Sequence, residues 1–160
     1  MAAVEADANL VEHGNALAEA IDRALPAWVV RCVTERVHDF FGVDASAEVV
    51  RDARVAGERA RVEVGAALRV LFAQDVDDQR VNPLAIVRGA VRYPTEVLRV
   101  AGVPPVVRDE FDERAFPDDL YALTPASFAD VDPALHEPGL LWGAAKAHAH
   151  LTRRRTTREA

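Results

Sequence analysis

The side chains with the clearest capacity to bind metal are the histidines near the C-terminus. His148 and His150 are two residues apart, so on a helix they lie about 200° apart around the axis and cannot share one ion. A second group combines imidazole and carboxylate ligands and comprises His136, Glu137, Asp130 and Asp132. It matches no zinc motif and lacks the ligand spacing and glycine of a calcium loop. We therefore expect no bound metal.

Paired carboxylates and a nucleophile are the other candidates for catalysis. Asp109 and Glu113 are four residues apart and could share a helix face, but their charged neighbours predict exposure rather than the burial that general acid–base work requires. Cys32 lies among valines in mid-helix, which predicts a buried, inert thiol. The chain has no phosphate-binding loop, nucleophile elbow or dinucleotide fingerprint. We expect no catalytic residue and no cofactor.

Negative charge is concentrated between residues 105 and 139, here called the acidic segment. It holds nine acids and two bases, so its charge of −7 equals the formal net charge of the whole chain. This segregation favours a non-catalytic cytoplasmic interaction or regulatory protein that binds a basic protein partner. The candidate partner-binding residues are Asp109, Glu110, Asp112, Glu113, Asp118 and Asp119.

Positive charge gathers at the C-terminus and supports an alternative function. The basic residues there are Arg153, Arg154, Arg155 and Arg158. They could contact nucleic-acid phosphates with strong salt dependence, although no aromatic residue is interleaved with them for base stacking. A third alternative is a small-molecule or enzymatic pocket between the N-terminal helices and the acidic segment, near Trp142, His136 or Tyr121.

The elements that must position these residues are helices built from small side chains. Of the 160 residues half are hydrophobic, but 30 are alanine and 23 valine, so we expect thin, closely packed helices. A single cysteine excludes a disulfide scaffold, and no apolar run is long enough to span a membrane. The N-terminus lacks the features of a signal peptide, so we expect a cytoplasmic protein without membrane attachment.

Helical periodicity predicts one all-α domain. Residues 5–74 form a long antiparallel hairpin that turns at 42–45, with Gly42 as the left-handed terminator and Ser46 or Asp44 as the next N-cap. Pro26 either kinks the first helix or opens a second one. Homodimerisation through the alanine-rich stripe is an open alternative, because small residues allow helices to approach closely, and nothing determines the stoichiometry.

Helix-capping residues and prolines predict where the helices of the second half of the chain begin and end. Asn82 and Pro83 begin a third helix over 83–101, and the acidic segment reads as short helical turns punctuated by prolines. A closing helix covers 139–155, followed by a basic tail at 156–160. The apolar face predicted for that closing helix contains Leu141, Ala144, Ala145, His148 and Leu151. The one lysine, Lys146, is either an ordinary surface residue or a contact to the acidic segment.

Several short motifs in the second half of the chain are similar to those of a group of known proteins. They are RYPTEVL at 92–98, GVPPVVRD at 102–109, FPDD at 116–119, LTP at 123–125, HEPG at 136–139 and WGAAK at 142–146. Over roughly residues 82–155 the chain resembles uncharacterised helical proteins of high-GC actinobacteria, which agrees with its 18 arginines against one lysine. The resemblance implies a helical fold and carries no activity or site residue.

Overall fold

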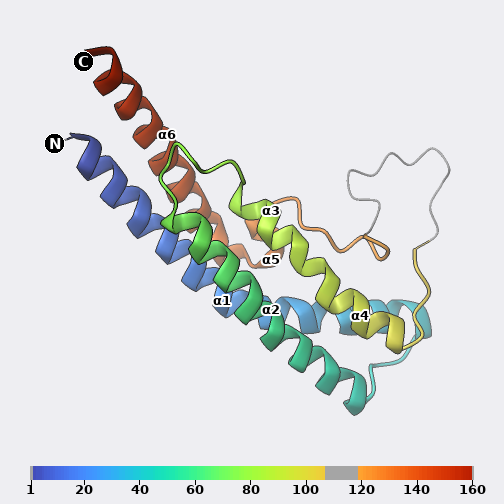
Figure 1. Ribbon diagram of the computed structural model, residues 1–160. Helices are drawn as coiled ribbons and strands as arrows, with labels where there is room; N and C mark the ends of the chain where they lie inside the picture. Colours follow the sequence, from blue (N-terminus) through green and yellow to red (C-terminus); the bar gives the residue numbers. More distant parts are fainter. Residues whose placement is uncertain (1, 107–118, 160) are drawn as a thin grey trace, which may run out of the picture.

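A computed structural model describes residues 2–106 and 119–159, and within those ranges the protein is helical without a strand (Figure 1). The prediction of an all-α fold is confirmed. In chain order the elements are α1 (Ala2–Phe41), α2 (Ala47–Ala73), α3 (Pro83–Arg88), the 3-10 turn η1 (Gly89–Val91), α4 (Arg92–Val100), α5 (Phe128–Val131), the 3-10 turn η2 (Pro133–Leu135) and α6 (His136–Glu159). No helix in these ranges combines the length and apolar character needed to cross a bilayer.

The hairpin of α1 and α2 begins and ends where local signals predict. Gly42 adopts a φ of +71° and donates its N–H to the carbonyl of His38 at 2.8 Å, which ends α1. The Ser46 side chain accepts from the Val49 N–H at 3.3 Å and begins α2. Pro26 lies inside α1 rather than opening a second helix.

Small residues let the two long helices approach closely. A Cβ at Gly57 of α2 would meet the backbone of Pro26 in α1 at 3.0 Å, so glycine is needed where the helices touch. Buried aliphatic residues continue this contact along both helices. They include Leu17, Ile21, Leu25, Val29 and Val33 of α1 and Ala53, Ala60, Val64 and Leu68 of α2.

The predicted third helix is divided into α3, η1 and α4. The Asn82 side chain caps α3 by accepting from the Leu84 N–H at 2.8 Å. Pro94 has no N–H to donate to the Ala90 carbonyl, so the chain tightens into a 3-10 turn before α4. Tyr93 then ties α4 to α2 by donating its hydroxyl to the Glu63 carboxylate.

The described end of the acidic segment is held by internal polar contacts. Asp119 is only 5% exposed, and its carboxylate accepts from the backbone N–H groups of Leu123 at 2.9 Å and Thr124 at 2.7 Å. The buried Tyr121 hydroxyl donates to the Val103 carbonyl at 2.7 Å. Short helices follow in α5 and η2, as the prolines predict.

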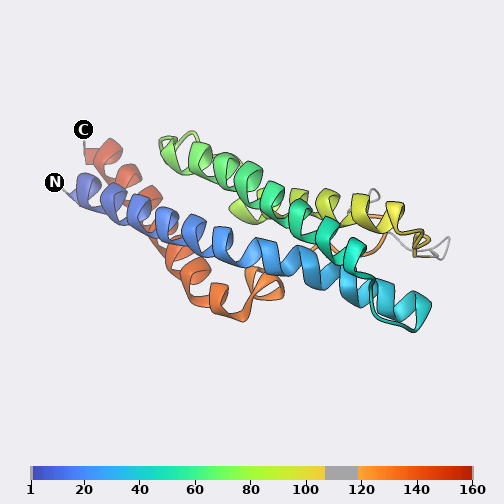
Figure 2. The ribbon, with the colours of Figure 1, turned by 90° about the horizontal axis from the view of Figure 1, so that it is seen from below.

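Helix α6 differs from the predicted closing helix in length and rotation. It runs from His136 to Glu159, so the predicted basic tail is helical up to that residue. The predicted inward face is wrong, because Leu141, His148 and Leu151 are exposed. Trp142 is buried instead, with its ring 5.8 Å from that of Phe72 in α2. Both α2 and α6 pack against α1, and along the N-terminal half of α1 they lie on different sides of it (Figure 2).

We expect Gly57→Ala to lower the free energy of unfolding by about 1–3 kcal/mol, because the added methyl group forces α1 and α2 apart at Pro26. Urea denaturation followed by circular dichroism measures the change. Gly89→Ala is the matched control: a Cβ there meets nothing within 4 Å, and the change should be neutral or slightly stabilising. Equal effects of the two substitutions would contradict this account of the helix contact.

Candidate functional site

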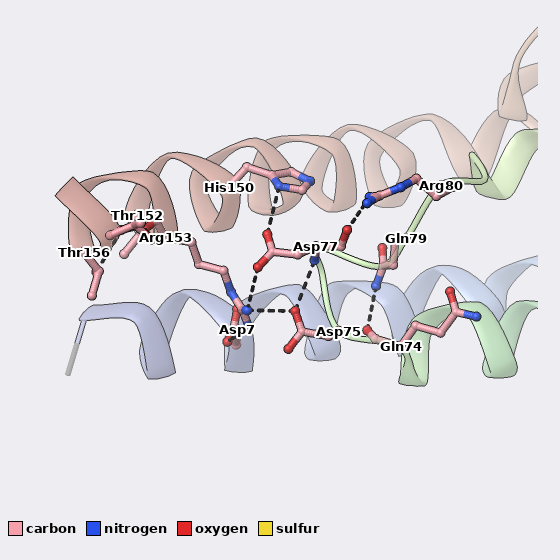
Figure 3. A network of polar contacts seen from close by, with 11 residues as sticks. Asp7, Gln74, Asp75, Asp77, Gln79, Arg80, His150, Thr152, Arg153 and Thr156 are labelled. Carbon is pink, nitrogen blue, oxygen red and sulfur yellow. Dashed lines mark hydrogen bonds and ion pairs between the residues drawn. The ribbon is translucent and has the colours of Figure 1, made fainter. Parts of the chain in front are cut away.

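Arg153 of α6 joins three carboxylates from two other parts of the chain (Figure 3). Its Nη2 atom donates to Asp7 Oδ2 of α1 at 2.6 Å. Its Nη1 atom lies 2.7 Å from Asp75 Oδ1 and 3.0 Å from Asp77 Oδ2, both in the loop between α2 and α3. One guanidinium therefore fastens α6 to α1 and to this loop.

The loop between α2 and α3, residues 74–82, is itself well organised. The Asp77 N–H donates to Asp75 Oδ1 at 3.1 Å, and the buried Gln79 amide donates to the Gln74 carbonyl at 3.1 Å. Val76 is almost fully buried and anchors the loop in the core. Arg80 donates to the Asp77 carbonyl and lines a hollow together with residues of α6 (Figure 3).

The charges in this cluster stabilise one another. The carboxylates raise the pKa of Arg153, with the hydrogen bond to Asp7 as the largest cause. The pKa of Asp75 is lowered, first by the backbone N–H of Asp77 and then by Arg153. Arg153 was predicted as a nucleic-acid contact, but its guanidinium is occupied by these ion pairs. We therefore assign it a positioning role.

Four other basic side chains of α6 form what we call the basic row: Lys146, His150, Arg154 and Arg158. Their four-residue spacing places one basic side chain per turn, about 6 Å apart along the axis. Arg80 faces the row from the loop, and the hollow between them has a volume of about 530 Å³. Arg153 and Thr157 of α6 and Asp77 of the loop also line it. A neighbouring hollow of about 420 Å³ continues past Arg80 to Lys146.

Cations are crowded along this row. The Lys146 ammonium lies 5.0 Å from the centre of the Trp142 ring, and its pKa is lowered first by burial and then by the charge of Arg80. His150 Nδ1 approaches Asp77 Oδ1 to 3.8 Å. Within residues 2–106 and 119–159, Arg154 and Arg158 have no ion-pair partner. An anion entering the hollow would therefore relieve repulsion between like charges.

Of the six acidic residues predicted to bind a partner, the structure describes only Asp119. Asp109, Glu110, Asp112, Glu113 and Asp118 lie outside the described residues. Asp119 is described, and its burial and internal hydrogen bonds exclude it from an exposed partner-binding surface. The prediction for this residue needs correction: its carboxylate is used to organise the chain locally.

The remaining candidates for chemistry have structural explanations or lie at the surface. Cys32 is buried, and burial raises the pKa of its thiol to about 12, which disfavours the nucleophilic thiolate. His136 and His148 are exposed. Within the described residues no group of three or more histidine, cysteine or carboxylate side chains is placed to hold a metal ion.

The sequence contained part of the signal for the basic row. The four-residue spacing from Lys146 to Arg158 can be found in the sequence, whereas the approach of Arg80 across the groove depends on the fold of the 74–82 loop.

Comparison with known proteins gives no further assignment. No protein-family model, no curated protein and no solved structure matches the chain. The resemblance to helical actinobacterial proteins stays a prediction.

Replacing Arg153 should weaken the whole end of the molecule where α1, α6 and the loop meet. We expect Arg153→Met to lower the free energy of unfolding by about 1.5–3 kcal/mol, because charge-assisted hydrogen bonds are lost and three carboxylates remain close together. Arg155→Met, at an exposed position of the same helix, should change it by less than about 0.5 kcal/mol. Urea denaturation of both variants tests this, and equal stabilities would refute the role of Arg153.

The lowered pKa of Asp75 makes stability depend on pH. Because its folded pKa is below the usual 3.8, the ionised carboxylate stabilises the protein fully above that value. This contribution is lost as the pH falls through the folded pKa. As the pH is lowered from about 5 to about 1, we expect the midpoint temperature of thermal unfolding to decrease, and to decrease less in the Asp75→Asn variant. Thermal denaturation across this pH range measures the midpoint temperature of the unaltered protein and of the variant. The same dependence on pH in both proteins would contradict a stabilising role for the ionised Asp75 carboxylate.

Proposed function

We propose that the protein binds the phosphate backbone of nucleic acid through the basic row and Arg80. The observation that carries this proposal is the row itself: one basic side chain per helical turn beside a hollow that a further arginine, Arg80, faces. The proposal requires binding alone and assigns no catalytic residue.

The chemistry of the row suits phosphate groups. Guanidinium groups present several donors in a fixed fork that matches phosphate oxygens, and Arg80, Arg154 and Arg158 supply three such groups. The Thr157 hydroxyl lines the same hollow and adds a neutral donor. The ion pairs of Arg153 hold the helix against the loop, so the cations are positioned before the ligand arrives.

The expected recognition is of backbone rather than base. No aromatic residue is interleaved in the basic row, and Trp142 beside it is buried, so a stacking platform for bases is absent from these described residues. Phosphate contacts alone give sequence-independent, salt-sensitive binding. The acidic remainder of the chain repels a polyanion and would orient the basic row toward it.

Binding should depend on the arginines of the row. We expect the triple variant Arg80→Gln, Arg154→Gln, Arg158→Gln to bind a fluorescein-labelled DNA duplex more weakly at every salt concentration. The slope of log affinity against log salt should become shallower by about 0.9 for each lost contact. Fluorescence anisotropy measures both quantities. The control variant Arg51→Gln, Arg54→Gln removes exposed arginines of α2 and should bind as the unaltered protein does.

Two results would overturn the proposal. One is equal affinity of the triple variant and the unaltered protein for duplex and single-stranded DNA. The other is that polyglutamate competes as well as unlabelled DNA does, which would identify an acidic protein rather than nucleic acid as the ligand.

The acidic segment carries a second proposal, that of binding a basic protein partner. What supports it is the charge of residues 105–139, which equals that of the whole chain. Asp119 does not belong to this surface, because its carboxylate is buried and internally bonded.

This second proposal predicts the behaviour of a variant that spares Asp119. We expect neutralisation of the five other acids to reduce capture of basic proteins from a cell extract. The substitutions are Asp109→Asn, Glu110→Gln, Asp112→Asn, Glu113→Gln and Asp118→Asn. Pull-down followed by mass spectrometry compares the proteins captured, and an unchanged set would rule out this surface.

A further inference from the structure

Helix α6 presents an apolar face to solvent, opposite the side that packs on α1. Leu140 is 60% exposed, Leu141 44% and Leu151 56%, although leucine side chains in a small protein are more often inside. Ala144 and Ala147 lie between them and are also exposed. The buried Trp142 and Ala149 point the other way.

The positions on this face follow the spacing of paired helices. Residues 137, 140, 144, 147, 151, 154 and 158 are separated alternately by three and four residues, and all are exposed. This is the spacing at which one helix contacts another along its length. We call these seven positions the α6 seam.

The α6 seam is complementary to itself when reversed. If two copies pair antiparallel about an axis midway between Ala144 and Ala147, each Ala144 opposes Ala147 of the other copy. Each Leu140 opposes Leu151. At both ends Glu137 opposes Arg154, a pair of opposite charge. A two-fold interface has this reciprocal form, in which residue i meets residue j and j meets i.

We propose that the protein forms a two-fold homodimer in which α6 pairs antiparallel with α6 of a second copy. The small central residues, Ala144 and Ala147, allow the two helices to approach closely. On either side of this centre, pairing removes the exposed Leu140 and Leu151 side chains from contact with water, which stabilises the dimer. Arg154 and Arg158 lie in both the α6 seam and the basic row, whereas Leu140, Ala144 and Leu151 belong to the seam alone, so substitutions at these three residues test the dimer without altering the basic row.

Charge selects both the partner and its direction. Within the described residues Glu137 and Arg154 have no ion-pair partner of their own, so each is available to a second copy. A parallel pair would bring Glu137 against Glu137 and Arg154 against Arg154, whereas the antiparallel pair matches opposite charges at both ends.

The first experiment measures stoichiometry. Sedimentation equilibrium of the full chain should show a monomer–dimer equilibrium that Leu151→Glu shifts to monomer, with circular dichroism confirming that α6 is intact. Val70→Glu, at an exposed valine of α2, is the matched control and should leave the equilibrium unchanged. A monomer at every concentration of the unaltered protein would overturn the proposal.

A charge exchange tests the end contacts. Glu137→Arg alone and Arg154→Glu alone should each weaken the dimer, because like charges then meet at both ends. An equimolar mixture of the two variants should recover the dimer, since each contact in the mixed pair again joins opposite charges. Failure of the mixture to recover would show that these residues do not meet.

Cross-linking determines the direction. A mixture of Leu140→Cys and Leu151→Cys should form a mixed disulfide dimer on oxidation, whereas either variant alone should not. The natural Cys32 is buried and gives a low background. Cross-linking of Leu140→Cys with itself would indicate a parallel pair and refute the arrangement.

Discussion

The contact of Arg153 with three carboxylates is the interaction that places the rest of α6. Asp7 comes from the N-terminal helix and Asp75 and Asp77 from the loop before α3, so the guanidinium joins segments far apart in sequence. A helix is rigid over a few turns, and holding one residue therefore sets the direction of every other side chain on it. With Arg153 and Trp142 turned inward, Lys146 and His150 face the loop and Leu140 and Leu151 face solvent.

Small side chains at the contact between α1 and α2 allow these two long helices to pack closely, and α6 packs against the same helix α1. Gly57 allows direct contact with the backbone of Pro26, and buried alanines such as Ala53 and Ala60 keep the two helices close. Between these small residues, leucine and isoleucine side chains such as Leu17, Ile21 and Leu68 are fully buried, so apolar burial along the whole contact stabilises the hairpin. One long face of α1 then remains for α6, whose largest buried residue is Trp142.

The charges of the C-terminal helix divide into two groups with different roles. Arg153 is used within the fold, whereas Arg154 and Arg158 remain without partners among the described residues. On this basis we propose polyanion binding and self-association through two overlapping faces of α6, which share Arg154 and Arg158. Lys146 belongs to polyanion binding alone, and Leu140 and Leu151 belong to self-association alone. A two-fold pair would carry two basic rows, and two sites on one assembly raise the effective affinity for a long polyanion.

The sequence by itself determined the helices and most of their ends. Periodic apolar residues, the terminator Gly42 and the caps Ser46 and Asn82 act within a few neighbouring residues, so they can be found without knowing the fold. Only the tertiary structure decided which face of α6 is buried. Leu140, Leu141 and Leu151 are as apolar as the residues that pack inward, and periodicity alone could not choose between the two faces. The meeting of Trp142 with Phe72, and of Arg153 with its carboxylates, made that choice across long separations in sequence.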